Sequence, residues 1–262
     1  MNTVKHRYSA EIQRSRGLLE LAATLYDTSL SFKTERAAEH AMQTESRVGY
    51  SLTLALTATR EKGVSLSFAA DGFRELLAVS QGKLSLGWIN PSVAATMAFR
   101  GKGLFYKRQP IRTIAVFPSY DVMGFAVHES TGINSLEEIR KECIPLRVST
   151  GTISKEWVKY SPTMFTVSAV MKAAGFTFAN LRQWGGKIQS VTRPSHPDRR
   201  EALEKGTINA VFDEGIKSWG KSAMDAGFRS LPVQGAILKK LTTIGYRASA
   251  LPKSRFPALP SD

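Results

Sequence analysis

The chain has 262 residues, of which 42% are apolar and 22% are charged, and its formal net charge is +14 with a pI near 10.0. This composition predicts a soluble globular protein with one large or two small domains, and it excludes a disordered chain. The single cysteine, Cys143, excludes an internal disulfide, and no apolar run reaches the ~20 residues of a transmembrane helix.

The positive charge is dispersed along the sequence. Its tightest groups are only pairs, among them residues 107–108, 199–200 and 239–240. Zinc-finger spacing, an aromatic RNA-binding motif and a basic helical run are all missing from the sequence. The charge therefore favours anionic small ligands and argues against nucleic acid as a partner.

The first part of the chain is predicted to alternate helices and strands. Residues 8–27 have the apolar spacing of a helix, and residues 28–47 are interpreted as helix or loop. Alternating apolar residues favour a strand over 50–59, where the alanine content leaves a helix as the alternative, and they predict strands over 64–68 and 84–88. Between the last two, a helix is predicted over 72–81, with Gly82 at its end. This order of elements predicts a largely parallel, buried sheet.

A strand, a tight turn and a helix are predicted around Pro91. Pro91 suits the first turn of a helix, and Val93 and Met97 begin an apolar face after it. Asn90 and Ser92 would then lie beside free N–H groups at a helix start, a place suited to an anion or a polar head group. An ordinary turn without a ligand is the alternative.

The middle of the chain contains a polar interruption. Residues 111–117 are predicted to form a strand, and residues 124–127 continue in extended structure after Ser119, Tyr120 and Asp121. These three residues form either a hinge between two lobes or a plain hairpin. Further on, Ser135 and Glu138 have the spacing of a capping box, which predicts a short helix to residue 142.

Two more predicted strands end in polar residues. A strand over 145–149 leads into Ser149, Thr150, Gly151 and Thr152, and a strand over 208–212 leads into Asp213 and Glu214. Ligands of α/β proteins bind at the carboxyl ends of strands, so these residues are predicted to line a cleft.

Helices are predicted over residues 161–174, 199–205, 216–226 and 234–245. A strand over 228–233 is expected to return the chain to the first lobe. Trp184 lies in a predicted turn, where it either stacks on a ligand or packs internally.

The motifs of common catalytic and metal sites are missing from the sequence. The four histidines are scattered without metal-binding spacing, and the sequence contains no nucleophile elbow, P-loop or dinucleotide-binding glycine pattern. Asp213 and Glu214 are adjacent, so their side chains would point apart in regular structure. The sequence therefore predicts binding without catalysis, and neither a metal nor a cofactor.

Several segments taken together resemble one family. They are GKLSLGWINPS (82–92), AFRGKGLF (98–105), IRTIAVFPS (111–119), GINSL (132–136), PLRVS (145–149) and INAVFDEG (208–215). In this order they resemble the TAXI-type solute-binding subunits of TRAP transporters and the wider NMT1-like group of periplasmic binding proteins. The resemblance covers residues 64–260.

This resemblance implies an α/β fold of the type II periplasmic-binding-protein class, with two lobes joined by a two-strand hinge. Residues 1–47 are then a helical segment, residues 48–120 and 228–262 form lobe one, and residues 121–227 form lobe two. The ligand would be an organic acid or an amino-acid-like molecule. Its predicted contacts are Asn90 and Ser92 in lobe one, Ser119, Tyr120 and Asp121 at the hinge, and Ser149–Thr152, Trp184, Asp213 and Glu214 in lobe two.

The resemblance also implies transporter subunits in a membrane as partners and a periplasmic location. A basic N-terminus without a signal-peptide core leaves a cytoplasmic location open. Two alternatives follow on the same fold: a cytoplasmic metabolite-sensing domain, or an NMT1-like enzyme of pyrimidine chemistry.

Overall fold

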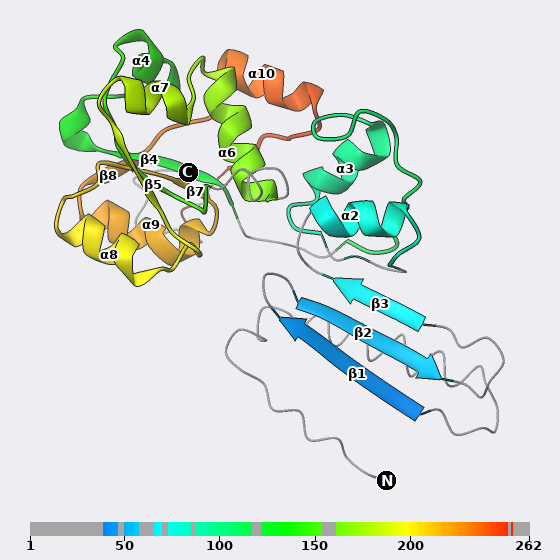
Figure 1. Ribbon diagram of the computed structural model, residues 1–262. Helices are drawn as coiled ribbons and strands as arrows, with labels where there is room; N and C mark the ends of the chain where they lie inside the picture. The colour runs from blue at the N-terminus through cyan, green and yellow to red at the C-terminus, as the bar shows by residue number, and fades with distance from the viewer. Residues whose placement is uncertain are drawn as a thin grey trace. The chain divides into compact units, whose positions relative to one another are not determined.

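The computed structural model describes residues 39–46, 50–57, 65–69, 73–84, 87, 89–116, 122–153, 161–250 and 253 (Figure 1). The chain divides into two compact units. Unit 1 contains residues 1–90 and 109–111, and unit 2 contains residues 91–108 and 112–262. The helix predicted over 8–27 and the polar interruption at Ser119, Tyr120 and Asp121 lie outside the described residues.

Unit 1 contains an antiparallel sheet with the order β1-β2-β3, formed by β1 (Glu39–Ser46), β2 (Tyr50–Thr57) and β3 (Ser65–Ala69). The strands predicted over 50–59 and 64–68 are confirmed. The expectation of a parallel sheet is wrong here, because residues 47–49 and 58–64 are too few for a parallel crossover. The helix or loop predicted over residues 28–47 is also wrong for residues 39–46, because these residues form β1.

Helix α2 (Phe73–Ser80) follows β3 and confirms the predicted helix, with Gly82 in the left-handed region at φ 70°. The strand predicted over 84–88 is not formed at the residues described there, Leu84 and Gly87. The strand predicted over 111–117 is also wrong, because residues 111–116 pair with no described strand. Alternating apolar residues form a stable strand only where their side chains can pack against neighbouring strands of a sheet.

Unit 2 is built on a mixed five-stranded sheet with the order β6-β5-β7-β4-β8. Its strands are β4 (Gly124–His128), β5 (Arg147–Thr150), β6 (Lys187–Ser190), β7 (Ala210–Asp213) and β8 (Phe228–Ser230). β5 runs parallel to both β6 and β7, whereas β4 is antiparallel to β7 and β8. β8 therefore joins the sheet of unit 2 beside β4 instead of returning the chain to the first lobe.

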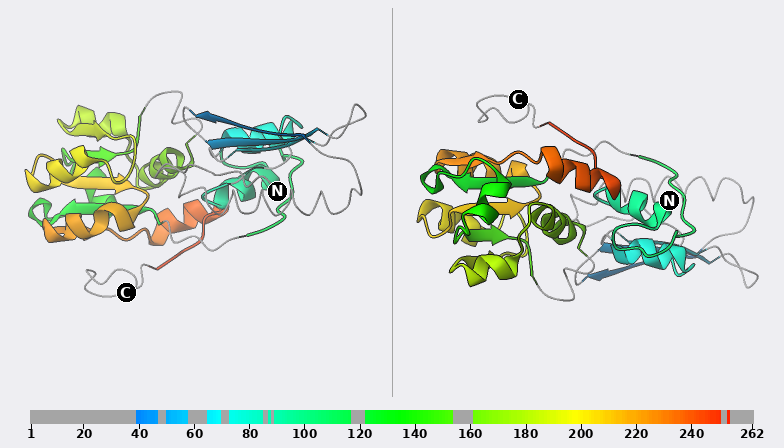
Figure 2. Two further views of the ribbon diagram at one scale, coloured as in Figure 1. Left: turned by 90° about the horizontal axis from the view of Figure 1, so that it is seen from below. Right: turned by 90° about the horizontal axis from the view of Figure 1, so that it is seen from above.

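Helices cover both faces of this sheet (Figures 1 and 2). Helices α4 (Leu136–Lys141), α6 (Pro162–Ala173), α7 (Phe178–Gln183) and α10 (Gly235–Thr243) share a core with Phe125, Val127 and Phe212. Helices α8 (Pro197–Glu204) and α9 (Ile216–Asp225) pack on the other face, against Ala126 and Val211. This alternation along β4 and β7 is that of strands buried on both faces, and it confirms an α/β fold.

Local signals in the sequence placed most helices of unit 2 correctly. The Ser135 hydroxyl accepts a hydrogen bond from the Glu138 N–H at 3.3 Å, and the Glu138 carboxylate accepts one from the Asn134 N–H at 2.8 Å. Ser161 caps α6, with Pro162 at its first position. The sequence pattern did not predict α7, a six-residue helix that is too short to show periodicity.

Helix α3 (Val93–Arg100) belongs to unit 2 and confirms the helix predicted after Pro91. Its apolar face is buried at Ala94, Met97 and Ala98. Gly101 ends it in the left-handed region at φ 66°, a conformation that glycine adopts without strain. The chain then turns back on itself through residues 102–108.

Candidate functional site

The sheet of unit 2 contains a topological switch point between β5 and β7. These strands are parallel neighbours, but α6 follows β5 on one face of the sheet and α9 follows β7 on the other. The chain therefore diverges beyond the carboxyl ends of the two strands, where α/β proteins form their ligand crevices. Residues 149–152 and 213–214, predicted from the sequence as ligand contacts, lie at this place.

Close contacts join the two strand ends to the start of α6. A Cβ on Gly151 would lie 3.1 Å from Met164 Sδ and 3.6 Å from Asp213 Oδ1. The Thr150 hydroxyl donates to the Phe212 carbonyl oxygen at 2.6 Å. Helix α6, strand β5 and strand β7 thus meet around Gly151, and a side chain at this position would press on Met164.

Strand β6 contributes to the same edge of the sheet. The Thr152 hydroxyl donates to the Val191 carbonyl oxygen at 3.3 Å, and the Ser190 hydroxyl donates to the Gly151 carbonyl oxygen at 3.0 Å. The Ile153 N–H in turn donates to the Ser190 hydroxyl oxygen at 2.9 Å. These bonds hold the backbone that leaves β5 in one conformation beside β6.

A buried arginine contacts the ends of both strands at the switch point. Arg199, in α8, is 1% exposed, and its Nη2 lies 2.5 Å from Asp213 Oδ2. Its Nε donates to the Ser149 hydroxyl at 3.0 Å, and its Nη1 donates to the Pro194 carbonyl oxygen at 3.0 Å. The second Asp213 oxygen accepts from the Glu214 N–H at 2.8 Å. A buried ion pair with these additional hydrogen bonds is a satisfied network.

Ser149 and Asp213 are predicted from the sequence as ligand contacts, but in this network their side chains are bonded to Arg199. Both side chains are fully buried and hydrogen-bonded within the protein, so they support the crevice from inside. Sequence analysis did not identify Arg199 as a site residue, because it is distinguished there only as one of a basic pair with Arg200. Arg200 is exposed, whereas Arg199 is buried.

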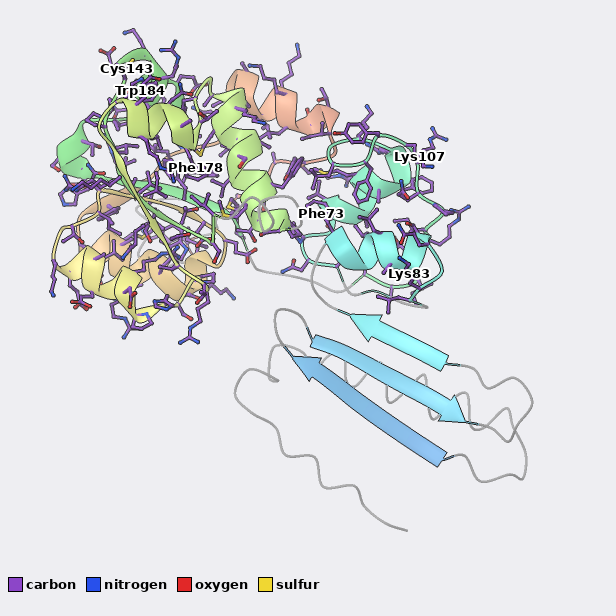
Figure 3. All side chains as sticks on the ribbon, viewed as in Figure 1. Phe73, Lys83, Lys107, Cys143, Phe178 and Trp184 are labelled. Carbon is purple, nitrogen blue, oxygen red and sulfur yellow. The ribbon has the colours of Figure 1, made fainter. Side chains whose placement is uncertain are left out.

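The other predicted site residues are spread over the chain. Asn90 is exposed in unit 1, and Ser92 precedes α3 in unit 2 without a capping bond from its side chain. Trp184 follows α7 at the amino ends of β5 and β6, the opposite edge of the sheet from the switch point. It is half-buried, with its ring 6.4 Å from that of Phe176 and 6.0 Å from the Arg140 guanidinium, and Figure 3 labels it near α7.

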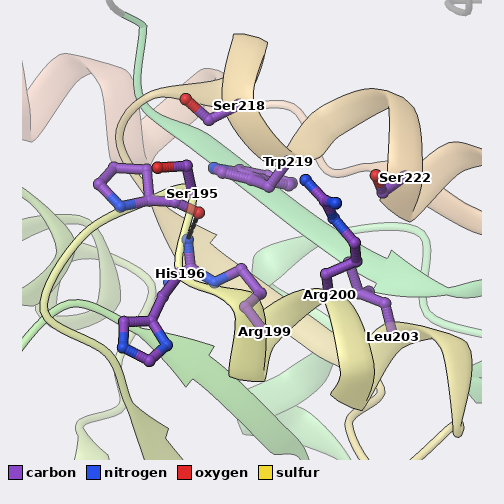
Figure 4. Close-up of a pocket in the computed structure, with 9 residues that line it drawn as sticks. Ser195, His196, Arg199, Arg200, Leu203, Ser218, Trp219 and Ser222 are labelled. Atoms are coloured by element: carbon purple, nitrogen blue, oxygen red, sulfur yellow. Dashed lines mark hydrogen bonds between the residues drawn. The ribbon is translucent and has the colours of Figure 1, made fainter. Parts of the chain in front are cut away.

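A separate shallow cleft lies between α8 and α9 (Figure 4). Its empty volume is about 220 Å³, a figure that includes space open to solvent. Its lining includes Ser195, Arg200, Ser218 and Trp219. The Trp219 indole N–H donates to the Glu214 carbonyl oxygen at 2.8 Å, which ties this cleft to the switch point.

Among the described residues, no group of three or more histidine, cysteine, aspartate or glutamate side chains could hold a metal ion. The described helices also include none with the length and apolar character needed to cross a membrane.

The chain matches no protein-family model, no curated protein and no solved structure. Its resemblance to TAXI-type subunits therefore stays a prediction.

Proposed function

We propose that the chain is a solute-binding protein of the type II periplasmic-binding-protein class, which holds a small organic acid or an amino-acid-like molecule. The observation that carries this proposal is the switch point between β5 and β7, where residues 149–152 and 213–214 come together. Ligand crevices form at such points because the flanking helices diverge. In this proposal the ligand is passed on to subunits of a membrane transporter.

The charge around the switch point supports a ligand with an anionic end. Helix α6 begins beside Gly151, and the first backbone N–H groups of a helix carry a partial positive charge. The net charge of +14 adds a field that attracts anions. Glu214 follows β7 at the same edge and supplies a carboxylate for a ligand ammonium group. A zwitterion such as an amino acid satisfies both requirements.

Binding without chemical turnover is part of this proposal. Arg199 neutralises Asp213, so this buried carboxylate is not available as a base. In unit 2, the imidazoles of His128 and His196 accept hydrogen bonds from backbone N–H groups at helix starts. Each of these two imidazoles therefore has a structural partner.

A thermal-shift panel of organic acids and amino acids on the full chain tests the proposal. A ligand at ~100 times its Kd adds about 2.7 kcal/mol, which raises the Tm of a protein of this size by roughly 5–10 °C. Glu214→Gln is expected to abolish the shift from amino acids, whereas the exposed Glu204→Gln keeps it. A panel without any shift, or equal shifts in both variants, would contradict the proposal.

A further inference from the structure

One surface of unit 2 is strongly basic. Between Glu75 and Asp121 the sequence contains no acidic residue but has six cations. Five of these are exposed on unit 2, in the loop after α3 and in the extended segment that follows: Arg100, Lys102, Lys107, Arg108 and Arg112. We call residues 99–108 and 112–116 together the basic loop surface.

The cations of this surface gather in space although they are separated in sequence. The Arg112 guanidinium lies 5.8 Å from the centre of the Phe99 ring. A Cβ on Gly101 would lie 2.5 Å from the Arg108 backbone nitrogen, so the end of α3 touches residues 107–108. Figure 3 shows Lys107 on the loop that follows α3. The pair at 107–108 is thus part of a larger cluster.

Apolar side chains are exposed among these cations. Phe99 is 52% exposed, Tyr106 is fully exposed, and Ile114 and Val116 are 68% and 79% exposed. They are the large hydrophobic residues that stand out as exposed in the described part of the chain. Exposed apolar groups rimmed by charge mark interaction surfaces.

Buried anchors hold the loop of this surface in place. Phe105 and Met97 are buried, and a Cβ on Gly103 would lie 2.5 Å from Met97 Sδ, so the loop packs tightly on α3. The Lys102 ammonium donates to the Thr243 carbonyl oxygen at the end of α10, at 3.2 Å. The exposure of Tyr106 therefore results from a packed loop and not from a frayed end.

We propose that the basic loop surface binds the surface of an anionic lipid bilayer. Lysine and arginine side chains would meet the anionic headgroups, and Tyr106, Ile114 and Val116 would enter the boundary between headgroups and acyl chains. Single-stranded nucleic acid is also an anionic partner that proteins bind with basic and aromatic residues. The surface fits it less well, because Arg112 covers one face of the Phe99 ring and aliphatic side chains do not stack on bases.

Sedimentation of the full chain with vesicles tests this inference. Vesicles containing 30% phosphatidylglycerol are expected to bind the protein, and pure phosphatidylcholine vesicles are not. Each cation near an anionic bilayer strengthens binding about fivefold, so Arg100→Gln with Arg108→Gln is expected to weaken it about 25-fold. Tyr106→Ser with Val116→Ser, which leaves the charge unchanged, is expected to weaken it at least tenfold.

The matched control removes the same charge elsewhere. Lys187 and Arg193 are exposed in β6 and before α8, and changing both to Gln is expected to weaken vesicle binding less than threefold. Equal losses in the two charge pairs would overturn the inference in favour of diffuse attraction. Tighter binding to a single-stranded oligonucleotide, lost in the same loop variants, would overturn it in favour of nucleic acid. Absence of binding to the anionic vesicles would also overturn it.

Discussion

The Arg199 guanidinium in α8 pairs with the Asp213 carboxylate at the end of β7, and both side chains are almost completely buried. Arg199 reaches β5 as well, through the Ser149 hydroxyl. One side chain from the helix layer therefore fixes the ends of the two strands that diverge at the switch point. The geometry of the proposed crevice depends on this arginine although its side chain is not exposed at the surface.

Arg199→Met is expected to lower the free energy of unfolding by about 3–5 kcal/mol, because it leaves the Asp213 carboxylate buried without its cation. Urea denaturation measures the loss. Arg200→Met is the matched control, and this exposed neighbour is expected to change stability by less than about 0.5 kcal/mol. Equal effects of the two substitutions would show that the buried pair does not stabilise the fold.

The sequence predicted the switch point better than the network beneath it. Polar residues after two strands, at 149–152 and 213–214, were expected at one edge of a sheet, and β5 and β7 are neighbours there. The burial of Arg199 could not be predicted, because it depends on how α8 packs on the sheet. Arginine is almost never fully buried unless it is paired, so sequence alone favours an exposed position.

The errors in unit 1 and at residues 111–116 both show what an apolar alternation leaves undetermined. Alternating apolar residues correctly indicated strands in β2 and β3, but the alternation carries no information on strand direction. The short connections at 47–49 and 58–64 do carry it, since a parallel crossover needs about a dozen residues. At 111–116 the pattern resembles a strand, whereas Ile114 and Val116 are exposed.

Gly186→Ala is expected to destabilise the protein by about 3 kcal/mol or more. A Cβ at this position would lie 2.4 Å from the Leu146 carbonyl oxygen and 2.7 Å from that of Leu181, and neither backbone group can move without disturbing β5 or α7. Gly151→Ala is the comparison, since its closest neighbour is the flexible Met164 side chain. We expect Gly151→Ala to cost less than about 1 kcal/mol in thermal or urea unfolding, and similar losses for both would contradict this interpretation.

Ser135→Ala is expected to lower the free energy of unfolding by about 1 kcal/mol, because the hydroxyl accepts a hydrogen bond from the Glu138 N–H at the start of α4.

The hydrogen bond from the Asn134 N–H lowers the pKa of Glu138, and Ser135 and nearby cations lower it further. Stability from this carboxylate is present above its unfolded pKa and is lost as the pH falls through its lower folded pKa. Glu138→Gln is expected to remove this acid dependence, whereas the exposed Glu137→Gln keeps it in unfolding measured from pH 6 to pH 3.

Tyr246 is expected to make stability fall at alkaline pH. Burial raises the pKa of its phenol to about 12, while its hydrogen bond with the Thr166 hydroxyl, at 2.6 Å, acts in the opposite direction. Because the folded pKa lies above the unfolded value near 10, this contribution is complete below about pH 10 and is lost as the pH rises toward 12.

Between pH 9.5 and pH 11.5 the wild type is therefore expected to lose about 2 kcal/mol more than Tyr246→Phe, measured by urea unfolding at each pH. Tyr106→Phe, at a fully exposed tyrosine, is expected to follow the wild-type curve. Parallel curves for wild type and Tyr246→Phe would show that the phenol ionises equally easily in the folded and unfolded chain, and that its contact with α6 imposes no cost on the anion.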